Sequence, residues 1–256
     1  MTILCYHEVR PGWASPLATD PGSFAEHCAW LSARKKVLPL DRAVGRLDRS
    51  GRLLAGETAL TFDDGFRGLY DHAFPVLRRS GLPATVFLVA RTLTGDDRPP
   101  DWVDTPPAQT ETQRLEMLTV DHVHEMQEAG IGFGSHSYAH TDLTELTFEE
   151  CVRDLRDSRL LLESLLGRPV PLLAYPRGRH DAVVRLAAET AGYSHAFTLP
   201  ERREATGPYA VPRVGLYHGN TLSDLRVKSA RAYLPVRTAP VYQLARAAVR
   251  TARRAS

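Results

Sequence analysis

The sequence has little cysteine, no long hydrophobic run and almost no net charge, and each shortage argues against a class of protein. Its three cysteines contain no CxxC pair and suggest neither a disulfide framework nor a cysteine zinc site. No stretch approaches the roughly 18 apolar residues of a membrane span. The N-terminus lacks the basic segment and long apolar run of a signal peptide. We therefore expect a cytoplasmic protein.

The formal net charge of +2 is too close to zero to predict a nucleic-acid partner, but it conceals an asymmetry. The last 56 residues contain eleven Lys and Arg against three Asp and Glu, so they carry +8, whereas the first 200 residues carry −6. Residues 237–256 place apolar side chains at helical spacing among arginines. We expect this tail to be a helix docked on a domain spanning 1–236, or an amphipathic helix on an anionic membrane.

Short apolar runs alternate with segments of helical period along the chain. The expected strands and apolar runs are 2–6, 37–40, 58–62, 84–89, 131–135, 170–175 and 195–199. The expected helices are one that begins at the Asp20 cap, then 41–47, one from about Phe66 or Gly68 to Ser80, 120–129, 148–166 and 181–191. This alternation predicts parallel βα units, arranged as an α/β barrel or a doubly wound sheet.

Polar clusters follow several of these strands, at the end where parallel α/β folds place their chemistry. Asp63 and Asp64 come directly after the strand 58–62 and precede a glycine. One carboxylate can bind a metal while the other stays free as a base. The same residues suit an Asx turn that caps the next helix equally well.

Two histidines, His136 and His140, follow the glycine-containing strand 131–135. Their spacing of four puts them on the same face of a helical turn, and neutral imidazoles at that distance suit zinc. Alone, such a pair is a weak signal. With Asp64 it supplies two nitrogens and one carboxylate and leaves a position open for water, as catalytic zinc requires.

Three further features are weaker taken alone. The Tyr175-Pro176-Arg177 segment has an irregular backbone that can aim an N–H into a cleft, or it is an ordinary turn. His218 is a candidate acid catalyst or an ordinary surface residue. Residues 91–118, with four prolines and the single aromatic anchor Trp102, are expected to form a loop over the site, or else to be disordered.

The motifs TFDDG, HSxxH, a YPxG segment and LxH, in this order, resemble the NodB-type polysaccharide deacetylases of carbohydrate esterase family 4. The resemblance extends from Thr2 to about Leu234. It implies a distorted (β/α) barrel that holds one divalent metal, usually zinc. It also implies a set of site residues: the metal ligands Asp64, His136 and His140, the general base Asp63, the general acid His218, and Leu216 in the acetyl pocket.

The third motif departs from the family pattern. Where many members have an arginine two residues before the proline, this chain has Ala174, and Arg177 replaces the tyrosine before Gly178. The arginine that orients the base must then come from elsewhere, and Arg177 and Arg213 are the candidates. We expect Tyr175, Pro176 and Arg177 to contact substrate, together with Trp102 and Leu216.

The resemblance implies hydrolysis of an N-acetyl group on an amino sugar in a glycan, glycolipid or glycoside precursor. Asp63 would take a proton from a zinc-bound water, and the backbone N–H of Arg177 would help to hold the oxyanion. Two alternatives use the same fold: hydrolysis of a non-sugar amide or cyclic imide in a small closed pocket, and a non-catalytic carbohydrate-binding relative. A cytoplasmic enzyme, in contact with a membrane or not, would act on a precursor rather than on mature cell wall.

Overall fold

The computed structural model describes residues 2–13, 15–51, 56–95, 100–103 and 115–242. At its centre is a nine-stranded sheet in which every strand pairs in parallel with its neighbours. Eight strands follow one path: β10 (Val211–Pro212), β9 (His195–Thr198), β8 (Leu172–Ala174), β7 (Gly132–Ser135), β6 (Thr85–Leu88), β5 (Glu57–Phe62), β1 (Thr2–Tyr6) and β11 (Val214–Gly215). The ninth, β4 (Lys36–Val37), pairs with β5.

The two ends of this path are consecutive in the chain. Only Arg213 separates β10 from β11, yet β10 pairs with β9 and β11 pairs with β1. The sheet therefore curls into a nearly closed barrel, and the chain itself bridges the remaining gap, which we call the seam. This confirms the distorted (β/α) barrel and excludes the doubly wound alternative.

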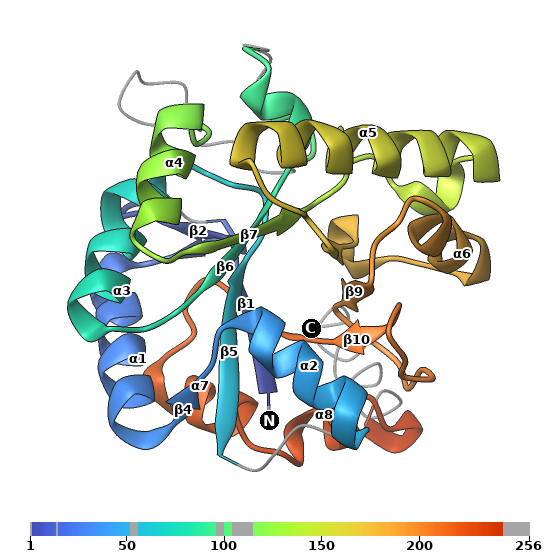
Figure 1. Ribbon diagram of the computed structural model, residues 1–256. Helices are drawn as coiled ribbons and strands as arrows, with labels where there is room; N and C mark the ends of the chain where they lie inside the picture. The colour runs from blue at the N-terminus through green and yellow to red at the C-terminus, as the bar shows by residue number, and fades with distance from the viewer. Residues whose placement is uncertain (1, 14, 52–55, 96–99, 104–114, 243–256) are drawn as a thin grey trace, which may run out of the picture.

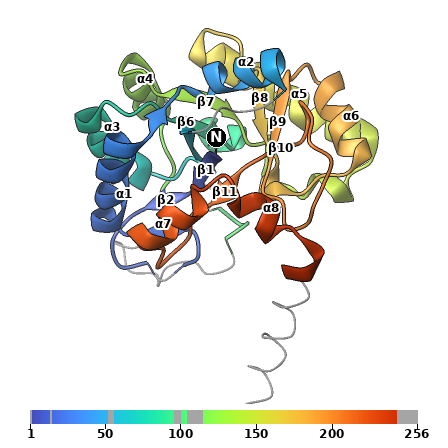
Figure 2. The same cartoon turned by 90° about the horizontal axis from the view of Figure 1, so that it is seen from below.

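Helices surround the strands (Figures 1 and 2). Figure 1 shows α1, α3 and α4 together on one side and α5 and α6 on the other. The helices are α1 (Pro21–Arg34), α2 (Leu40–Ser50), α3 (Phe74–Ser80), α4 (Val120–Glu128), α5 (Phe148–Leu166), α6 (Ala182–Thr190), α7 (Leu222–Lys228) and α8 (Tyr233–Arg237). A two-stranded sheet pairs β2 (Glu8–Val9) with β3 (Ala18–Thr19). None of the helices in the described ranges has the length and apolar character needed to cross a bilayer.

Helix ends lie where the sequence places capping residues. The Asp20 carboxylate accepts hydrogen bonds from the backbone at the start of α1, and Thr147 forms a capping box with Glu150 at the start of α5. The expected helix 66–80 is divided, because a π-helical turn (Leu69–Ala73) precedes α3. Pro75 explains the division, since it has no N–H and its ring clashes with the carbonyl four residues earlier.

Apolar side chains fill the barrel interior, and the polar site lies above them. Ile3 of β1, Ala59 of β5 and Phe87 of β6 pack with residues of α2, which closes the end of the barrel where the strands begin. Gly134 of β7 leaves room for Phe87, because a Cβ at position 134 would collide with that ring. A larger apolar cluster lies between the sheet and helices α1 and α3.

Most of the expected tail 237–256 lies beyond the described part of the chain, which ends at residue 242. The boundary between a domain of 1–236 and a separate tail therefore stays a prediction. So do cytoplasmic location and contact with an anionic membrane.

Candidate active site

The pairing register of β1 and β5 brings the first polar group together. Cys5 lies opposite Thr61. Because side chains on a strand alternate between faces, His7 and Asp63, two residues further on, leave the strands on the same inward face. Ligand atoms of Cys5, His7 and Asp63 lie within 4.8 Å of one another, and all three residues are buried.

Asp64 reaches the same space through an unusual backbone conformation. As the next residue after Asp63 it would point away from the interior on a regular strand. Its φ of 72° is in the left-handed region that non-glycine residues rarely adopt. The indole N–H of Trp102 donates to Asp64 Oδ1 over 3.1 Å and holds the carboxylate in place.

The two histidines come together without a helical turn, so that part of the expectation is wrong. The segment after β7 is irregular, and both Ser137 (φ 67°) and His140 (φ 59°) are left-handed. The Ser137 hydroxyl accepts a hydrogen bond from the His140 backbone N–H, and Asp154 of α5 accepts one from Tyr138 N–H. The imidazoles of His136 and His140 still meet, with ring centroids 4.9 Å apart. Strain of this kind gathers at functional sites.

Asp64, His136 and His140 form a group suited to a metal ion. His136 Nδ1 donates to the carbonyl of Ala174 over 2.8 Å, which leaves its Nε2 as an acceptor. That Nε2 lies 3.7 Å from Asp64 Oδ1, and His140 Nε2 lies 3.3 Å from the same oxygen. Two buried imidazoles and a buried carboxylate within reach of one another are ligand types that a divalent metal takes, so this donor set fits such an ion.

Arg213 holds the neighbouring carboxylate. Its guanidinium makes a forked pair with Asp63, Nη1 to Oδ1 and Nη2 to Oδ2, each over 2.7 Å, and Nη1 also donates to Thr61 Oγ1 over 3.1 Å. The Cys5 thiol donates to Asp63 Oδ2 over 3.3 Å. Of the two candidate orienting arginines, Arg213 therefore contacts Asp63, whereas Arg177 donates to the carbonyl of Trp102 over 3.3 Å.

The two adjacent carboxylates have opposite electrostatics. Burial would raise the pKa of Asp63, but the charge and hydrogen bonds of Arg213 outweigh it and hold the pKa well below its usual range. Burial, followed by the charge of Asp63, raises the pKa of Asp64 well above its usual range. Asp63 is therefore ionised at neutral pH, while Asp64 gains its negative charge most readily with a cation beside it.

His7 is the residue that motif reasoning missed. It is 8% exposed, its ring stacks against Tyr217 with centroids 6.1 Å apart, and its Nδ1 has no hydrogen-bond partner within the described ranges. Burial lowers the pKa of His7 to about 4. His218, by contrast, is exposed. Its backbone N–H donates to Pro16, and no contact recorded among the described residues joins its imidazole to the two carboxylates.

Of the other residues expected to contact substrate, Trp102 lies beside one of the two histidines, whereas Tyr175 and Leu216 are buried in apolar clusters. The Trp102 ring stacks on His140, with centroids 4.8 Å apart. Tyr175 points away into a second apolar cluster, where its hydroxyl donates to the Tyr209 carbonyl over 3.0 Å. Leu216 is fully buried in the main core beside Cys5.

The third-motif turn, Pro176–Gly178, has a buried proline and a left-handed Arg177 with φ 56°. Trp102 is the part of the expected loop 91–118 that reaches Asp64 and His140, and residues 96–99 and 104–114 of that loop lie outside the described ranges.

Comparisons with known proteins agree with the resemblance to polysaccharide deacetylases. The family model described as polysaccharide deacetylase matches residues 52–196. YxkH of Bacillus subtilis, whose name assigns it to the polysaccharide deacetylases, is 26% identical over 223 residues, covering 86% of this chain and 72% of that protein. The poly-β-1,6-N-acetyl-D-glucosamine N-deacetylase of Staphylococcus epidermidis is 26% identical over 203 residues, covering 75% of this chain and 65% of that protein.

Two solved structures resemble the fold closely. The deacetylase PplD of Streptococcus pyogenes, solved with acetate, matches with a TM-score of 0.75 and 21% identity, covering 90% of this chain and 98% of that one. IcaB of Ammonifex degensii matches with a TM-score of 0.68 and 25% identity, covering 91% of this chain and 96% of that one.

Proposed function

The chain belongs to the polysaccharide deacetylase family, of the NodB type in carbohydrate esterase family 4, and we propose that it is a metal-dependent hydrolase that removes the N-acetyl group of an amino sugar. One observation carries the proposal: an ionised carboxylate, Asp63, is held by Arg213 beside a separate set of metal-ligating groups. This arrangement divides proton transfer and metal binding between adjacent residues. The Staphylococcus epidermidis relative, named for an N-acetylglucosamine polymer, supports an acetylated glycan or glycan precursor as substrate.

Asp64, His136 and His140 would hold the metal, with zinc as our first choice. Such an ion, when bound, lowers the pKa of a water at the open position and polarises the acetyl carbonyl. The ligands are buried and two of them have left-handed backbones, so the site is shaped before the ion arrives. The His136–Ala174 hydrogen bond keeps Nε2 directed inward.

Asp63 takes the proton of the attacking water. Arg213 occupies one lone pair on each Asp63 oxygen, and the Cys5 thiol occupies a second one on Oδ2, which leaves a lone pair on Oδ1 to accept that proton. The left-handed turn at Arg177 lets its backbone N–H face the oxyanion that develops on the acetyl carbonyl. Trp102, stacked on His140, covers the ligands and excludes water from one side.

The departing amine needs a proton, and His7 is better placed than His218 to supply it. His7 is buried next to Asp63, whereas His218 lies on the surface. With a pKa lowered to about 4, His7 is a neutral imidazole. It acts as a relay: one ring nitrogen gives its proton to the amine while the other takes back the proton that Asp63 received.

Acetate release from oligomers of β-1,6-linked N-acetylglucosamine tests the proposal. We expect turnover that a chelator abolishes and added zinc restores. Asp63→Asn should lower kcat by about 10²–10⁴-fold, the usual contribution of a general base, and retain bound metal in elemental analysis. Asp121→Asn, on the exposed start of α4, is the matched control.

Metal bound stoichiometrically without acetate release from these oligomers would contradict the amino-sugar function. Release from cyclic imides instead would favour the alternative substrate class. If Asp63→Asn loses its metal, the division of roles between Asp63 and Asp64 is wrong.

A further inference from the structure

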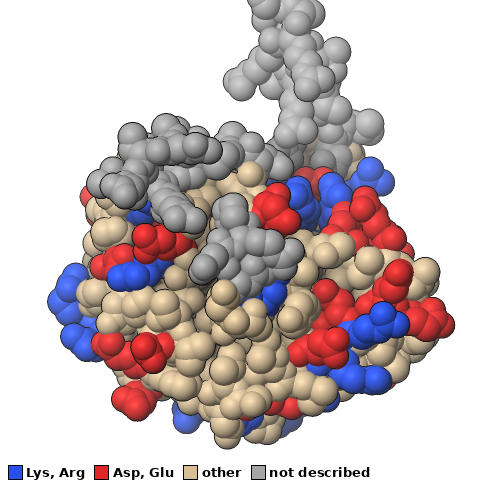
Figure 3. All heavy atoms as spheres, turned by 90° about the horizontal axis from the view of Figure 1, so that it is seen from above, with Lys and Arg blue, Asp and Glu red and all other residues tan. Residues whose placement is uncertain are grey.

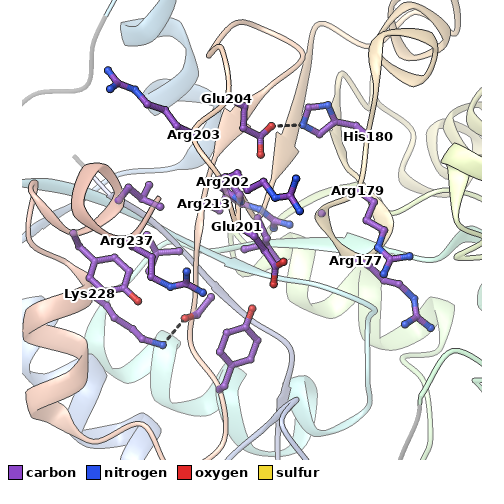
Figure 4. A pocket seen from close by; sticks show the side chains of 18 of the residues that line it. Arg177, Arg179, His180, Glu201, Arg202, Arg203, Glu204, Arg213, Lys228 and Arg237 are labelled. Atoms are coloured by element: carbon purple, nitrogen blue, oxygen red, sulfur yellow. Dashed lines mark hydrogen bonds and ion pairs between the residues drawn. The ribbon is translucent and has the colours of Figure 1, made fainter. Parts of the chain in front are cut away.

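A pocket of about 1000 Å³ opens at the seam of the barrel (Figure 4). Its walls come from the segments that follow β8, β9 and β11 and from α7 and α8. Seven Lys and Arg line it against only two Glu. In Figure 4, Arg202 lies between Arg177 and Arg179 on one side and Lys228 and Arg237 on the other. On the face shown in Figure 3, positive and negative side chains are interspersed around an uncharged area.

The pocket adjoins the carboxylates of the active site. Arg213, which lines it, makes the forked pair with Asp63. Tyr217, also in the wall, stacks on His7, and Arg177 donates to the carbonyl of Trp102, whose indole bonds Asp64. A group bound in the pocket is therefore separated from the reaction site by a single layer of side chains.

Several of these cations are not matched by carboxylates. Lys228 Nζ donates to two neutral oxygens, the Gly215 carbonyl over 2.8 Å and Asn220 Oδ1 over 2.7 Å. The salt bridges recorded in the described ranges include none for Arg202 or Arg203. One of the two glutamates, Glu204, is paired with His180 over 2.7 Å.

Lys228 is also a poorly solvated cation. Burial lowers its pKa to about 8; the charge of Asp224 opposes this shift, and the smaller effect of Arg237 adds to it. A bound anion would favour the charged form of this ammonium group.

We propose that the seam pocket binds a phosphate group that the substrate carries next to its N-acetylated sugar. The inference rests on the proposed deacetylase function and narrows its substrate to phosphorylated amino sugars, whether free or linked to a further group. A phosphate offers up to two negative charges and three terminal oxygens, which match several guanidinium and ammonium donors converging from different elements. A neutral sugar would give Arg202, Arg203 and Lys228 no anionic partner in the pocket.

The test compares N-acetylglucosamine 1-phosphate with the uncharged methyl glycoside of N-acetylglucosamine. We expect wild type to show a higher kcat/KM for the phosphate, and the ratio of the two values to fall about tenfold in Arg202→Gln, as for the loss of one charge-assisted hydrogen bond. Lys228→Gln should lower the ratio similarly. Arg226→Gln, an exposed cation on the same helix α7 but outside the pocket, should leave the ratio unchanged.

A wild-type ratio of one, or an equal fall in Arg226→Gln, would overturn the proposal. Arg202 is exposed, so its variant is decisive even if Lys228→Gln fails to fold. If neither compound is hydrolysed, the deacetylase function fails, but calorimetry still tests the pocket. Binding of N-acetylglucosamine 1-phosphate that Arg202→Gln weakens would support a phosphate site in the pocket. No binding would overturn that proposal.

A last arm distinguishes a lipid phosphate from a sugar phosphate. Co-sedimentation with phosphatidylglycerol vesicles should not depend on Arg202. Vesicle binding that Arg202→Gln weakens, with an unchanged substrate ratio, would assign the anion to a lipid headgroup and overturn the proposal.

Discussion

The candidate active site, which we call the mouth of the barrel, and the seam pocket hold their charged side chains in different ways. In the mouth, Asp63, Asp64, His136 and His140 are at most 8% exposed and are positioned by close polar contacts and left-handed backbones. In the pocket, the arginines after β9 are exposed and stand on an irregular segment. Burial fixes protonation and geometry, which chemistry needs. Exposed cationic side chains can change conformation to fit a bound anion, but they discriminate less well between one anion and another.

Arg213 belongs to both regions. It lies at the seam, lines the pocket and is 1% exposed, and its charge keeps Asp63 ionised. In the proposed function, recognition and catalysis therefore share the buried Arg213–Asp63 ion pair. Variants that separate the two regions should affect one property and spare the other.

The largest difference between mouth and pocket should appear in two histidine variants. His7→Gln removes the buried imidazole beside Asp63, and we expect kcat for acetate release to fall about 10²–10⁴-fold with bound metal unchanged. His218→Gln, in the exposed segment after β11, should alter kcat by less than about threefold. Steady-state kinetics with elemental analysis measures both. The reverse order would restore His218 as the proton donor.

The sequence predicted the scaffold well because strands and helix caps are local signals. The strand 2–6 and the helix 148–166 match the structure to the residue. The strand ends also indicated where Asp63, Asp64, His136 and His140 would gather, and the structure brings these four together.

The motifs left both Arg177 and Arg213 open as partners of Asp63, because motifs do not fix long-range contacts. Arg213 meets Asp63 only because the sheet curls until β10 and β11 face each other across the seam. His7 carried a usable signal, since alternation along β1 places it on the same face as Cys5. Tyr175 is turned outward by the same alternation, and the Ser137 backbone is a tertiary effect that spacing does not reveal.

Removing Arg213 should disable the ion pair that both regions share. Arg213→Met leaves Asp63 as an uncompensated buried charge, so we expect a loss of about 3–5 kcal/mol in the free energy of unfolding. Denaturant titration measures it, and adding Asp63→Asn should recover most of the loss. Arg179→Met, which breaks an exposed pair with Asp142, should cost less than about 1 kcal/mol. Equal losses would show that the buried pair is no more important to folding than the exposed one.

Buried and exposed carboxylates should also differ in how stability depends on pH. Burial raises the pKa of Glu8 to about 8, and its environment includes a hydrogen bond from the Gly68 backbone. The unfolded chain ionises Glu8 near pH 4.5, so stability is present below that pH and is lost as pH rises toward 8. Glu8→Gln removes this loss and should be more stable than wild type by about 2–4 kcal/mol at pH 8. Thermal unfolding from pH 5 to 9 measures it.

The exposed Glu204 is the matched control for Glu8. Glu204→Gln breaks only a surface contact with His180 and should change the unfolding free energy by less than about 1 kcal/mol. If wild type and Glu8→Gln lose stability in parallel between pH 5 and 8, Glu8 is not the source of the dependence.

Trp102 connects the two regions, because its N–H bonds Asp64 in the mouth and its carbonyl accepts from Arg177 of the pocket. Trp102→Phe keeps an aromatic ring against His140 and the backbone carbonyl but removes the N–H. We expect zinc affinity, measured by competition with a chromophoric chelator, to fall about 10–100-fold, as for other outer-shell partners of metal ligands. Trp30→Phe, on α1, should not change it. An unchanged affinity in Trp102→Phe would mean that the left-handed backbone alone positions Asp64, and that the mouth does not depend on the loop it shares with the pocket.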